Sequence, residues 1–263
     1  MAVEPALALR GVTKRFGGLA VSDDVSFDVP SGARVALIGP NGAGKTTLFN
    51  LISGVHKIDS GAILLDGKPI QDLPPRKRVR AGLSRSFQNI RLMPHLSVIE
   101  NIMLGQHTLA TDMRSLLTPL AWQRKSKWRM QARDSMMRAG IDVDPDASVG
   151  GLPYGLRKKI EVVRALMSRP RLLMLDEPAA GLNPRETAEL SAFLKAVAWD
   201  GLTLLVVEHD MSFVHDLCEH TVVLNFGRLI YDGPTRGVQD DRQVREAYLG
   251  SRRVGAKEIG HVA

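Results

Sequence analysis

Hydrophobic positions along the chain follow two alternating patterns. Runs of four apolar residues recur at Val35–Ile38, Leu172–Leu175 and Leu204–Val207, and short continuous runs of this kind are typical of strands buried on both faces. Helical periodicity follows the second and third runs, at about 185–198 and 211–218. Because strands that alternate with helices build mostly parallel sheets covered on both sides, the pattern predicts an α/β core.

Two regions interrupt this alternation. Near the N-terminus, Val25–Val29 alternates apolar and polar residues, and Ile63–Leu65 leads into a turn at Asp66-Gly67; both features predict antiparallel strands. A further strand is expected at Leu83–Phe87, and from about 97 to 169 the pattern is helical. We therefore expect one domain over residues 1–250, with an N-terminal antiparallel β subdomain and a helical subdomain inserted at about 90–165, followed by a tail at 251–263.

The composition is that of an ordinary globular protein. The 263 residues are 44% hydrophobic and 24% charged, and no stretch approaches the roughly 18 apolar residues that a membrane span needs. The first residues, Met1–Pro5, include an acidic residue and no apolar segment of the secretory type. Cys218 is the only cysteine, which excludes an internal disulfide and fits a reducing compartment. We expect a soluble protein of the cytoplasm.

Positive charge is concentrated in two stretches. The net charge is +7, and nine cations lie in Arg76–Arg80 and Arg124–Arg133, so the rest of the chain is close to neutral. Such clusters often bind nucleic acid or anionic membranes. The more common arrangement is a solvated helix face, and we predict two such faces and no nucleic-acid partner.

A glycine-rich segment follows the first buried strand and precedes an expected helix at about Lys45–Ile52. It matches G-x-x-x-x-G-K-[ST], and its context of strand, loop and helix is the one the motif requires. Backbone N–H groups of such a loop face phosphate oxygens. Lys45 is placed to neutralise the β- and γ-phosphates and Thr46 to offer its hydroxyl to Mg²⁺. The predicted nucleotide-binding residues are Gly39, Pro40, Asn41, Gly42, Ala43, Gly44, Lys45, Thr46 and Thr47.

A second acidic element supports a nucleotide site. The buried run Leu172–Leu175 ends in Asp176 and Glu177. Placed at the end of a parallel strand, Asp176 is expected to act on Mg²⁺ and Glu177 to polarise the attacking water. An apolar run ending in two acids is weak evidence for a nucleotide site by itself. Its position after the glycine-rich loop, in the expected order and at the expected distance, makes the evidence specific.

With these two motifs, the chain from about Leu7 to Leu249 resembles the ATP-binding subunits of ABC transporters. The resemblance implies that Gln88 ligates Mg²⁺ and senses a membrane partner, and that His209 contacts the γ-phosphate. It also implies that Phe16 stacks on adenine. Leu152–Leu156, with Gly155, occupies the position of the family's signature motif, and Ala180–Asn183 that of its D-loop. Four segments are similar in sequence to the LivG-type subunits of branched-chain amino-acid importers: Phe16–Leu19, Leu37–Thr47, Leu175–Pro184 and Val244–Gly250.

The signature segment keeps only Leu152 and Gly155 of the family pattern, and the D-loop departs from it at one position. The signature is generally Leu-Ser-Gly-Gly-Gln, but Pro153 replaces the serine and Leu156 the glutamine, and Asn183 stands where the D-loop usually has aspartate. Proline offers neither a hydroxyl nor an N–H. In the family's sandwich arrangement, the signature of one subunit covers the nucleotide bound by the other. The resemblance then implies weaker nucleotide binding at any site that this chain's signature covers. We predict a heterodimer with a second ATPase subunit whose serine is intact, and a homodimer remains the alternative.

The resemblance implies an ATP-hydrolysing subunit of an importer of branched-chain or other amino acids. Its implied partners are the second ATPase subunit, two integral-membrane permease subunits and a periplasmic or extracellular substrate-binding protein, and its expected location is the cytoplasmic face of the inner membrane. Alternatives are urea uptake, lipopolysaccharide export, a soluble ABC ATPase acting on DNA, and a kinase-like P-loop enzyme. Positions 45 and 152 are 107 residues apart, which fits a compact helical subdomain and not the long coiled coil of the DNA-acting proteins.

The segment Gln88–His107 is the predicted dock for a helix of a membrane subunit. Ile90, Leu92 and Met93 are apolar, and basic residues flank them, a combination suited to an amphipathic helix. Complete burial of these three side chains within the subunit would contradict this prediction.

Overall fold

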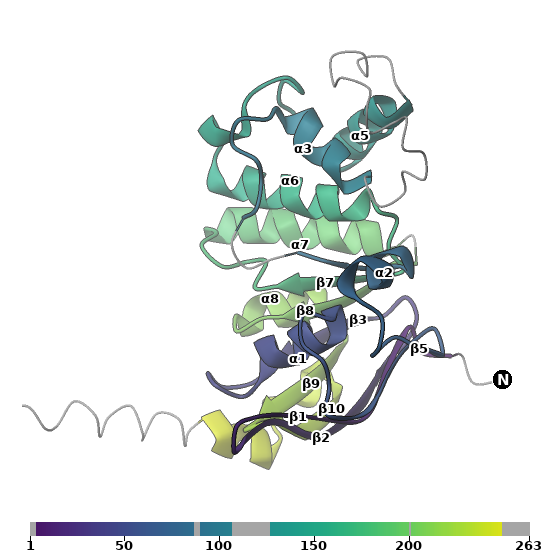
Figure 1. The fold of residues 1–263 in the computed structure, drawn as a ribbon. Coiled ribbons are helices and arrows are strands. Elements are labelled where there is room, and N and C mark those ends of the chain that lie inside the picture. Colours follow the sequence, from purple (N-terminus) through teal and green to yellow (C-terminus); the bar gives the residue numbers. More distant parts are fainter. Residues whose placement is uncertain (1–3, 87–89, 107–126, 200, 249–263) are drawn as a thin grey trace, which may run out of the picture.

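The computed structural model describes residues 4–86, 90–106, 127–199 and 201–248 (Figure 1). An antiparallel sheet with the strand order β2-β1-β4-β5 forms one edge of the molecule. Its strands are β1 (Leu7–Phe16), β2 (Leu19–Val29), β4 (Ser60–Leu65) and β5 (Lys68–Pro69). Val25, Phe27 and Val29 are all buried, as their alternation predicts.

The second sheet has six strands in the order β10-β9-β3-β8-β7-β6. All neighbours are parallel except β10, which is antiparallel to β9. The predicted mostly parallel α/β fold with an antiparallel β subdomain is therefore confirmed. The strands are β3 (Arg34–Ile38), β6 (Leu83–Arg85), β7 (Leu172–Asp176), β8 (Thr203–Val207), β9 (His220–Asn225) and β10 (Arg228–Pro234). Of the expected strand Leu83–Phe87, the structure contains the first three residues, and Phe87 lies outside the described residues.

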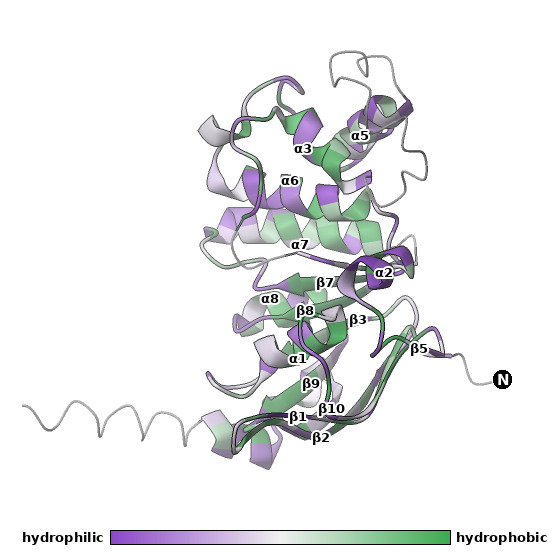
Figure 2. Ribbon diagram, in the orientation of Figure 1, coloured by the Kyte–Doolittle hydropathy of each residue, from purple (hydrophilic) through white to green (hydrophobic). Residues whose placement is uncertain are grey.

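The continuous apolar runs of the central strands serve two hydrophobic cores. In β3, Ala36 and Ile38 pack into one core while Val35 and Leu37 pack into the other, because successive side chains of a strand point to opposite faces. The first core joins the sheet to the helices of the upper part of Figure 1, and the second joins it to α1 and the antiparallel sheet. Figure 2 shows the resulting hydrophobic colouring along the buried strands.

Helices cover both faces of the six-stranded sheet, and α3, α5 and α6 lie together beyond α7 (Figure 1). The helices are α1 (Lys45–Ser53), α2 (Pro75–Arg80), α3 (Val98–Leu104), α5 (Lys127–Arg138), α6 (Tyr154–Leu166), α7 (Pro184–Trp199) and α8 (Met211–Leu217). Short 3₁₀ turns lie at Val149–Gly151 and Thr235–Gly237. Within the described residues, none of the helices has the length and apolar character that crossing a lipid bilayer requires.

One residue of the first basic stretch is not solvated. Arg78 of α2 is 2% exposed, and its guanidinium donates to the carbonyl oxygens of Leu51 (2.6 Å), Ile52 (2.7 Å), Gln71 (2.8 Å) and Leu73 (2.8 Å). Leu51 and Ile52 belong to the last turn of α1, whose carbonyls have no partner within the helix. The prediction of a solvated face is wrong for this residue, and burial lowers the pKa of Arg78.

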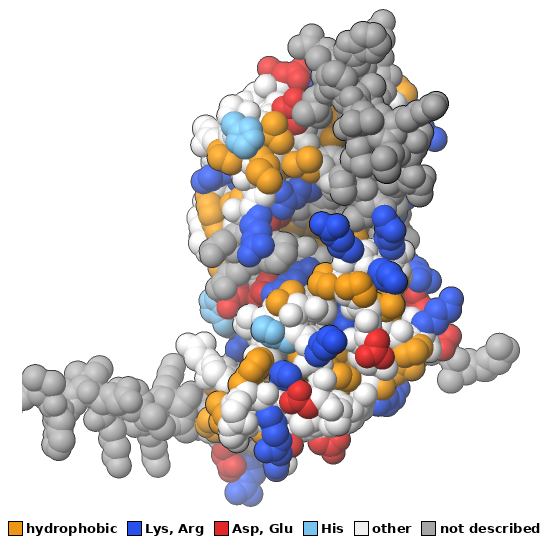
Figure 3. All heavy atoms as spheres, in the orientation of Figure 1, with side chains coloured by type: hydrophobic (Ala, Val, Ile, Leu, Met, Phe, Trp, Pro, Cys, Tyr) orange, Lys and Arg blue, Asp and Glu red, His pale blue; other side chains and the backbone are white. Residues whose placement is uncertain are grey.

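The other basic residues agree better with the prediction. Arg76, Lys77 and Arg80 of the same helix are exposed, and Figure 3 shows lysine and arginine side chains over this part of the surface with acidic side chains nearby. In the second stretch, Arg129 is paired with Asp146 at 2.8 Å, and Arg124 and Lys125 lie outside the described residues.

Candidate nucleotide site

The glycine-rich loop leaves the carboxyl end of β3 and enters α1 through backbone conformations that favour glycine. Gly39, Gly42 and Gly44 have φ values of +150°, +80° and +100°. A Cβ at Gly39 would lie 2.1 Å from the carbonyl oxygen of Leu224, and one at Gly44 would lie 2.5 Å from that of Val21. Both the dihedral angles and the close backbone neighbours therefore require glycine at these two positions.

Lys45 reaches back over this loop. Its Nζ donates to the carbonyl oxygens of Gly39 (2.7 Å) and Pro40 (3.1 Å). Partial burial lowers the pKa of Lys45, and the negative charges of Glu177 and Asp176 oppose that shift. The ammonium group is thus held at the centre of the loop by backbone oxygens, close to the two acids that follow β7.

The start of α1 suits an anion. Gly44 is the N-cap residue, no side chain caps this end, and the first turn carries no acidic residue, so the N–H groups of the first turn remain available for negatively charged oxygens. Thr46 is exposed in this turn and Thr47 is half-buried, while in the loop Asn41 is exposed and Ala43 buried. This arrangement fits a phosphate chain.

The two acids at the carboxyl end of β7 have different environments. Asp176 is the last residue of the strand and is 5% exposed. Glu177 has φ +48°, and its N–H donates to the carbonyl oxygen of Val207 in β8 at 2.9 Å. Lys158 of α6 donates from Nζ to the carbonyl oxygen of Glu177 at 3.3 Å. The chain therefore leaves the sheet at Glu177 in a left-handed backbone conformation, and hydrogen bonds to β8 and α6 hold it there. A carboxylate and a hydroxyl, from Asp176 and Thr46, are the oxygen ligands that Mg²⁺ prefers.

His209 follows β8 at the same edge of the sheet. Its side chain is 67% exposed, and its Nδ1 lies 3.8 Å from Oε2 of the buried Glu208. Glu208 accepts the backbone N–H groups of Ala179 (2.8 Å) and His209 (3.1 Å), and burial raises the pKa of Glu208. Sequence reasoning missed Glu208, which joins the ends of β7 and β8; its signal is an acid directly after a fully apolar strand.

Phe16 ends β1 at the rim of the antiparallel sheet and is 44% exposed. Its ring and that of His56 form a T-shaped pair with a centroid distance of 5.4 Å, and Nζ of Lys14 lies over the Phe16 ring, 5.4 Å from its centroid. The Phe16 ring is thus partly exposed at the surface, with two neighbouring side chains against it. Gln88, the remaining predicted site residue, lies outside the described residues.

The signature and D-loop segments lie at the N-terminal ends of two helices. Pro153 is the N-cap residue of α6, where no side-chain cap is present. Asn183 precedes α7 and forms reciprocal hydrogen bonds of 3.0 Å with Glu186, each side chain accepting the other residue's N–H. This capping box gives Asn183 a local structural role. A Cβ at Gly155 would lie 2.6 Å from Oε1 of Glu186, so the two segments are in close contact.

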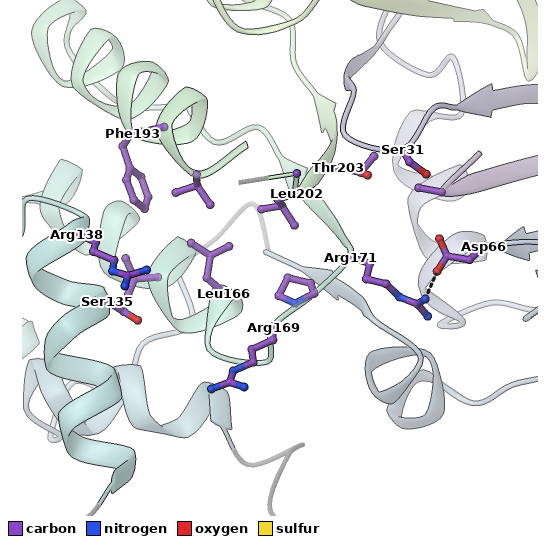
Figure 4. A pocket seen from close by; sticks show the side chains of 16 residues that line it. Ser31, Asp66, Ser135, Arg138, Leu166, Arg169, Arg171, Phe193, Leu202 and Thr203 are labelled. Carbon is purple, nitrogen blue, oxygen red and sulfur yellow. Dashed lines mark ion pairs between the residues drawn. The ribbon is translucent and has the colours of Figure 1, made fainter. Parts of the chain in front are cut away.

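A pocket of about 750 Å³ lies at the opposite, amino edge of the parallel strands (Figure 4). Leu166, Phe193 and Leu202 supply apolar surface, and Arg171 pairs across it with Asp66 at 2.7 Å. Of the predicted nucleotide-site residues that the structure describes, none lines this pocket. The carboxyl edge, where ligands of parallel α/β sheets bind, is thus a separate place in the molecule.

Comparisons with known proteins agree with this geometry. The sequence profile of the ABC transporter family matches residues 22–180. The chain is 41% identical over 250 residues to the high-affinity branched-chain amino acid transport ATP-binding protein BraF of Pseudomonas aeruginosa, covering 94% of this chain and 98% of that protein. It is 37% identical over 251 residues to LivG of Escherichia coli, a protein with the same descriptive name, at the same coverage.

Solved structures share the whole architecture. A nucleotide-free ATP-binding cassette from an ABC transporter superposes with a TM-score of 0.82 at 28% identity, covering 93% of this chain and 98% of that one. The ADP conformation of an ABC transporter cassette gives a TM-score of 0.81 at 29% identity, covering 94% and 99%.

The glycine-rich loop, the acids that follow β7 and the fold they share with these structures define an ATP-binding cassette. The chain belongs to the ABC transporter family, whose ATP-binding subunits hydrolyse ATP. The predicted family and ATPase activity are confirmed.

Proposed function

We propose that this chain powers the import of branched-chain amino acids through separate membrane subunits. The observation that carries the proposal is the similarity to BraF and LivG, which extends over 94% of this chain and 98% of each relative. Neither urea uptake nor lipopolysaccharide export is named for these two relatives. The proposed partners are two permease subunits, a periplasmic substrate-binding protein and a second ATPase subunit, with the chain at the cytoplasmic face of the inner membrane.

Each predicted site residue has a proposed role in the hydrolysis of ATP. The loop from Gly39 to Thr47 wraps the phosphates, and Lys45 neutralises the β- and γ-phosphate oxygens. Thr46 and Asp176 would hold Mg²⁺, which supplies positive charge to those oxygens when it is bound. The assignment is supported by the position of Lys45 on the loop after β3 and of Asp176 and Glu177 at the end of β7, and by the negative charges of the two acids, which oppose the lowering of the pKa of Lys45 by burial.

The remaining residues complete the proposed reaction. Glu177 accepts a hydrogen bond from the attacking water and orients it toward the γ-phosphate. His209 contacts the γ-phosphate from the end of β8, Gln88 ligates the metal and reports to the membrane subunits, and Phe16 stacks on adenine. Gly155 offers its N–H, together with the uncapped N-terminus of α6, to the nucleotide of the partner ATPase subunit.

The dock for a membrane subunit is proposed at residues 90–95. Met93 is 46% exposed, Arg91 and His95 are exposed, and Ile90 and Leu92 are half-buried. Leu92 packs against the core that joins the six-stranded sheet to the helices, so Met93 is the most exposed of the three apolar side chains. A cysteine at position 93 should crosslink to a permease loop in the assembled complex.

Reconstitution of the complete transporter tests the function. The permeases and ATPase subunits encoded beside this chain would be placed in proteoliposomes, and ATP-dependent uptake of radiolabelled leucine measured with the substrate-binding protein present. Leucine uptake that disappears in Glu177→Gln is expected. Uptake of urea instead of leucine, or ATPase activity stimulated by DNA and not by the membrane subunits, would overturn the proposal.

A further inference from the structure

The side chain of Arg85 lies between the two elements that carry the proposed Mg²⁺ ligands. Arg85 is the last residue of β6, and its Nη2 donates to Oδ2 of Asp176 at 2.7 Å. The side chains of Arg85 and Asp176 are 9% and 6% exposed. Among the ion pairs of the described residues, this is the only one in which both side chains are less than 10% exposed.

The same guanidinium also holds α1. Its Nη1 donates to Oδ1 of Asn50 at 2.7 Å and to Oγ of Ser53 at 3.1 Å, and the group lies 5.5 Å from the ring centroid of Phe49. In an α-helix, residues three, four and seven apart share one face. Thr46 therefore lies on the face of α1 that Arg85 contacts.

This arrangement connects residues that are distant in sequence. Asp176 belongs to β7, and Thr46 to the helix that follows β3. Arg85 reaches both elements with separate nitrogen atoms, and its planar, rigid donor group fixes the direction of each hydrogen bond. The hydrogen bond that Arg85 donates to Oδ2 of Asp176 orients this carboxylate.

We propose that Arg85 is a positioning residue that sets the distance and orientation between Asp176 and Thr46 and thereby the metal affinity of the site. The inference rests on the proposed function, because it takes Asp176 and Thr46 as the residues that hold Mg²⁺. Partners that orient metal-binding carboxylates commonly change metal affinity by about 10- to 100-fold when they are removed.

The test measures metal binding without turnover. In a Glu177→Gln background, Mn²⁺ serves as a spectroscopic substitute for Mg²⁺, and its affinity for the protein–ATP complex is titrated by electron paramagnetic resonance. ATP affinity is measured in parallel with EDTA. Arg85→Gln is expected to weaken Mn²⁺ binding about tenfold or more and to change metal-free ATP affinity less than about twofold, because Lys45 and the loop remain.

Two milder variants separate positioning from charge. Arg85→Lys keeps the positive charge, but one ammonium group cannot keep both sets of hydrogen bonds, so it should also weaken Mn²⁺ binding. Asn50→Ala leaves the ion pair intact and removes one anchor on α1, and a smaller loss in the same direction is expected. If Arg85→Gln fails to fold, Asn50→Ala tests the proposal in its place. Arg10→Gln is the matched control, since Arg10 pairs with Asp28 in the exposed part of the antiparallel sheet.

Comparison with Asp176→Asn separates the positioning role of Arg85 from the metal-binding role of Asp176. If Asp176→Asn abolishes Mn²⁺ binding and Arg85→Gln leaves it unchanged or strengthens it, the role of Arg85 is overturned and that of Asp176 stands. Equal losses of metal-free ATP affinity and Mn²⁺ affinity in the Arg85 variants would show a merely structural role and also overturn it. If Asp176→Asn has no effect on Mn²⁺, the proposed role of Asp176 fails and the inference fails with it.

Discussion

The two halves of the proposed ATP site are built in different ways. The phosphate half consists of the loop Gly39–Thr46 and the acids Asp176 and Glu177, and it lies at the carboxyl edge of parallel strands. Backbone and partly buried side-chain hydrogen bonds hold each of its parts. The signature half consists of Leu152–Leu156 and the D-loop, and it lies at the N-termini of α6 and α7.

The signature half has fewer fixed donors. Pro153 supplies no side-chain cap to α6, and Oδ1 of Asn183 accepts the N–H of Glu186 within the cap of α7. The phosphate half is therefore expected to bind nucleotide by itself. The signature half depends on what a partner subunit presents to it, and this difference is why a heterodimer is proposed.

The strongest test of the difference is a pair of substitutions within the phosphate half. Lys45→Ala is expected to reduce ATP affinity about a hundredfold or more, because it removes the charge at the centre of the loop. Glu177→Gln should keep the affinity and stall hydrolysis, because it retains shape but loses the ability to polarise water. Affinity and single-turnover hydrolysis would be measured separately, and an equal loss of binding in both variants would contradict the assigned roles.

The second test concerns the support of the phosphate half. Arg78→Met should lower the free energy of unfolding by about 3 kcal/mol or more, because two carbonyl oxygens at the end of α1 and two that precede α2 lose the guanidinium as a donor. Urea denaturation measures the change. Arg76→Met, on the exposed face of the same helix, is the control and should stay within about 0.5 kcal/mol of the parent. Similar values for the two variants would show that α1 needs no such anchor.

The smallest expected effect belongs to the signature half. Pro153→Ser restores a hydroxyl that can bond a charged phosphate, which is worth roughly 1.5–3 kcal/mol. In the purified chain, ATP-induced dimerisation should therefore become about tenfold tighter. A serine N-cap also stabilises α6 by about 1 kcal/mol, so thermal unfolding without ATP must be measured beside it.

The mixture with the partner ATPase subunit provides the decisive comparison for Pro153. It should hydrolyse ATP faster than the chain alone. If the chain alone dimerises on ATP and matches the rate of the mixture, with Pro153→Ser neutral, the heterodimer proposal is wrong.

Local patterns explain why so much of the fold could be predicted from the sequence. A few consecutive residues encode each apolar run of β3, β7 and β8, and the same is true of the glycine-rich loop. The predicted boundaries of these elements are close to those in the structure. The loop is predictable because its glycines are required by backbone conformation and by close backbone neighbours, as at Gly39 and Gly44. Composition and periodicity alone would have supplied the fold class without the site.

Long-range contacts account for what the sequence did not predict. Arg78 lies in a run of basic residues that predicts an exposed helix face, yet its side chain binds carbonyl oxygens 26 and 27 residues away. Arg85 and Asp176 are 91 residues apart, and Glu208 binds the N–H of Ala179 across 29 residues. Such pairs depend on which strands become neighbours, and this information is absent from any short window of sequence.

The position of β3 in the sheet has a consequence for synthesis on the ribosome. β3 lies between β8 and β9, so both of its hydrogen-bonded neighbours come from residues 203–225. At about 5–20 residues per second, they emerge on the order of ten seconds or more after Ile38. During this interval the strand that begins the nucleotide loop has no partner, and its apolar residues depend on transient contacts or chaperones. Nascent chains that stop before β8 should consequently fail to retain ATP, even though they contain the whole glycine-rich loop.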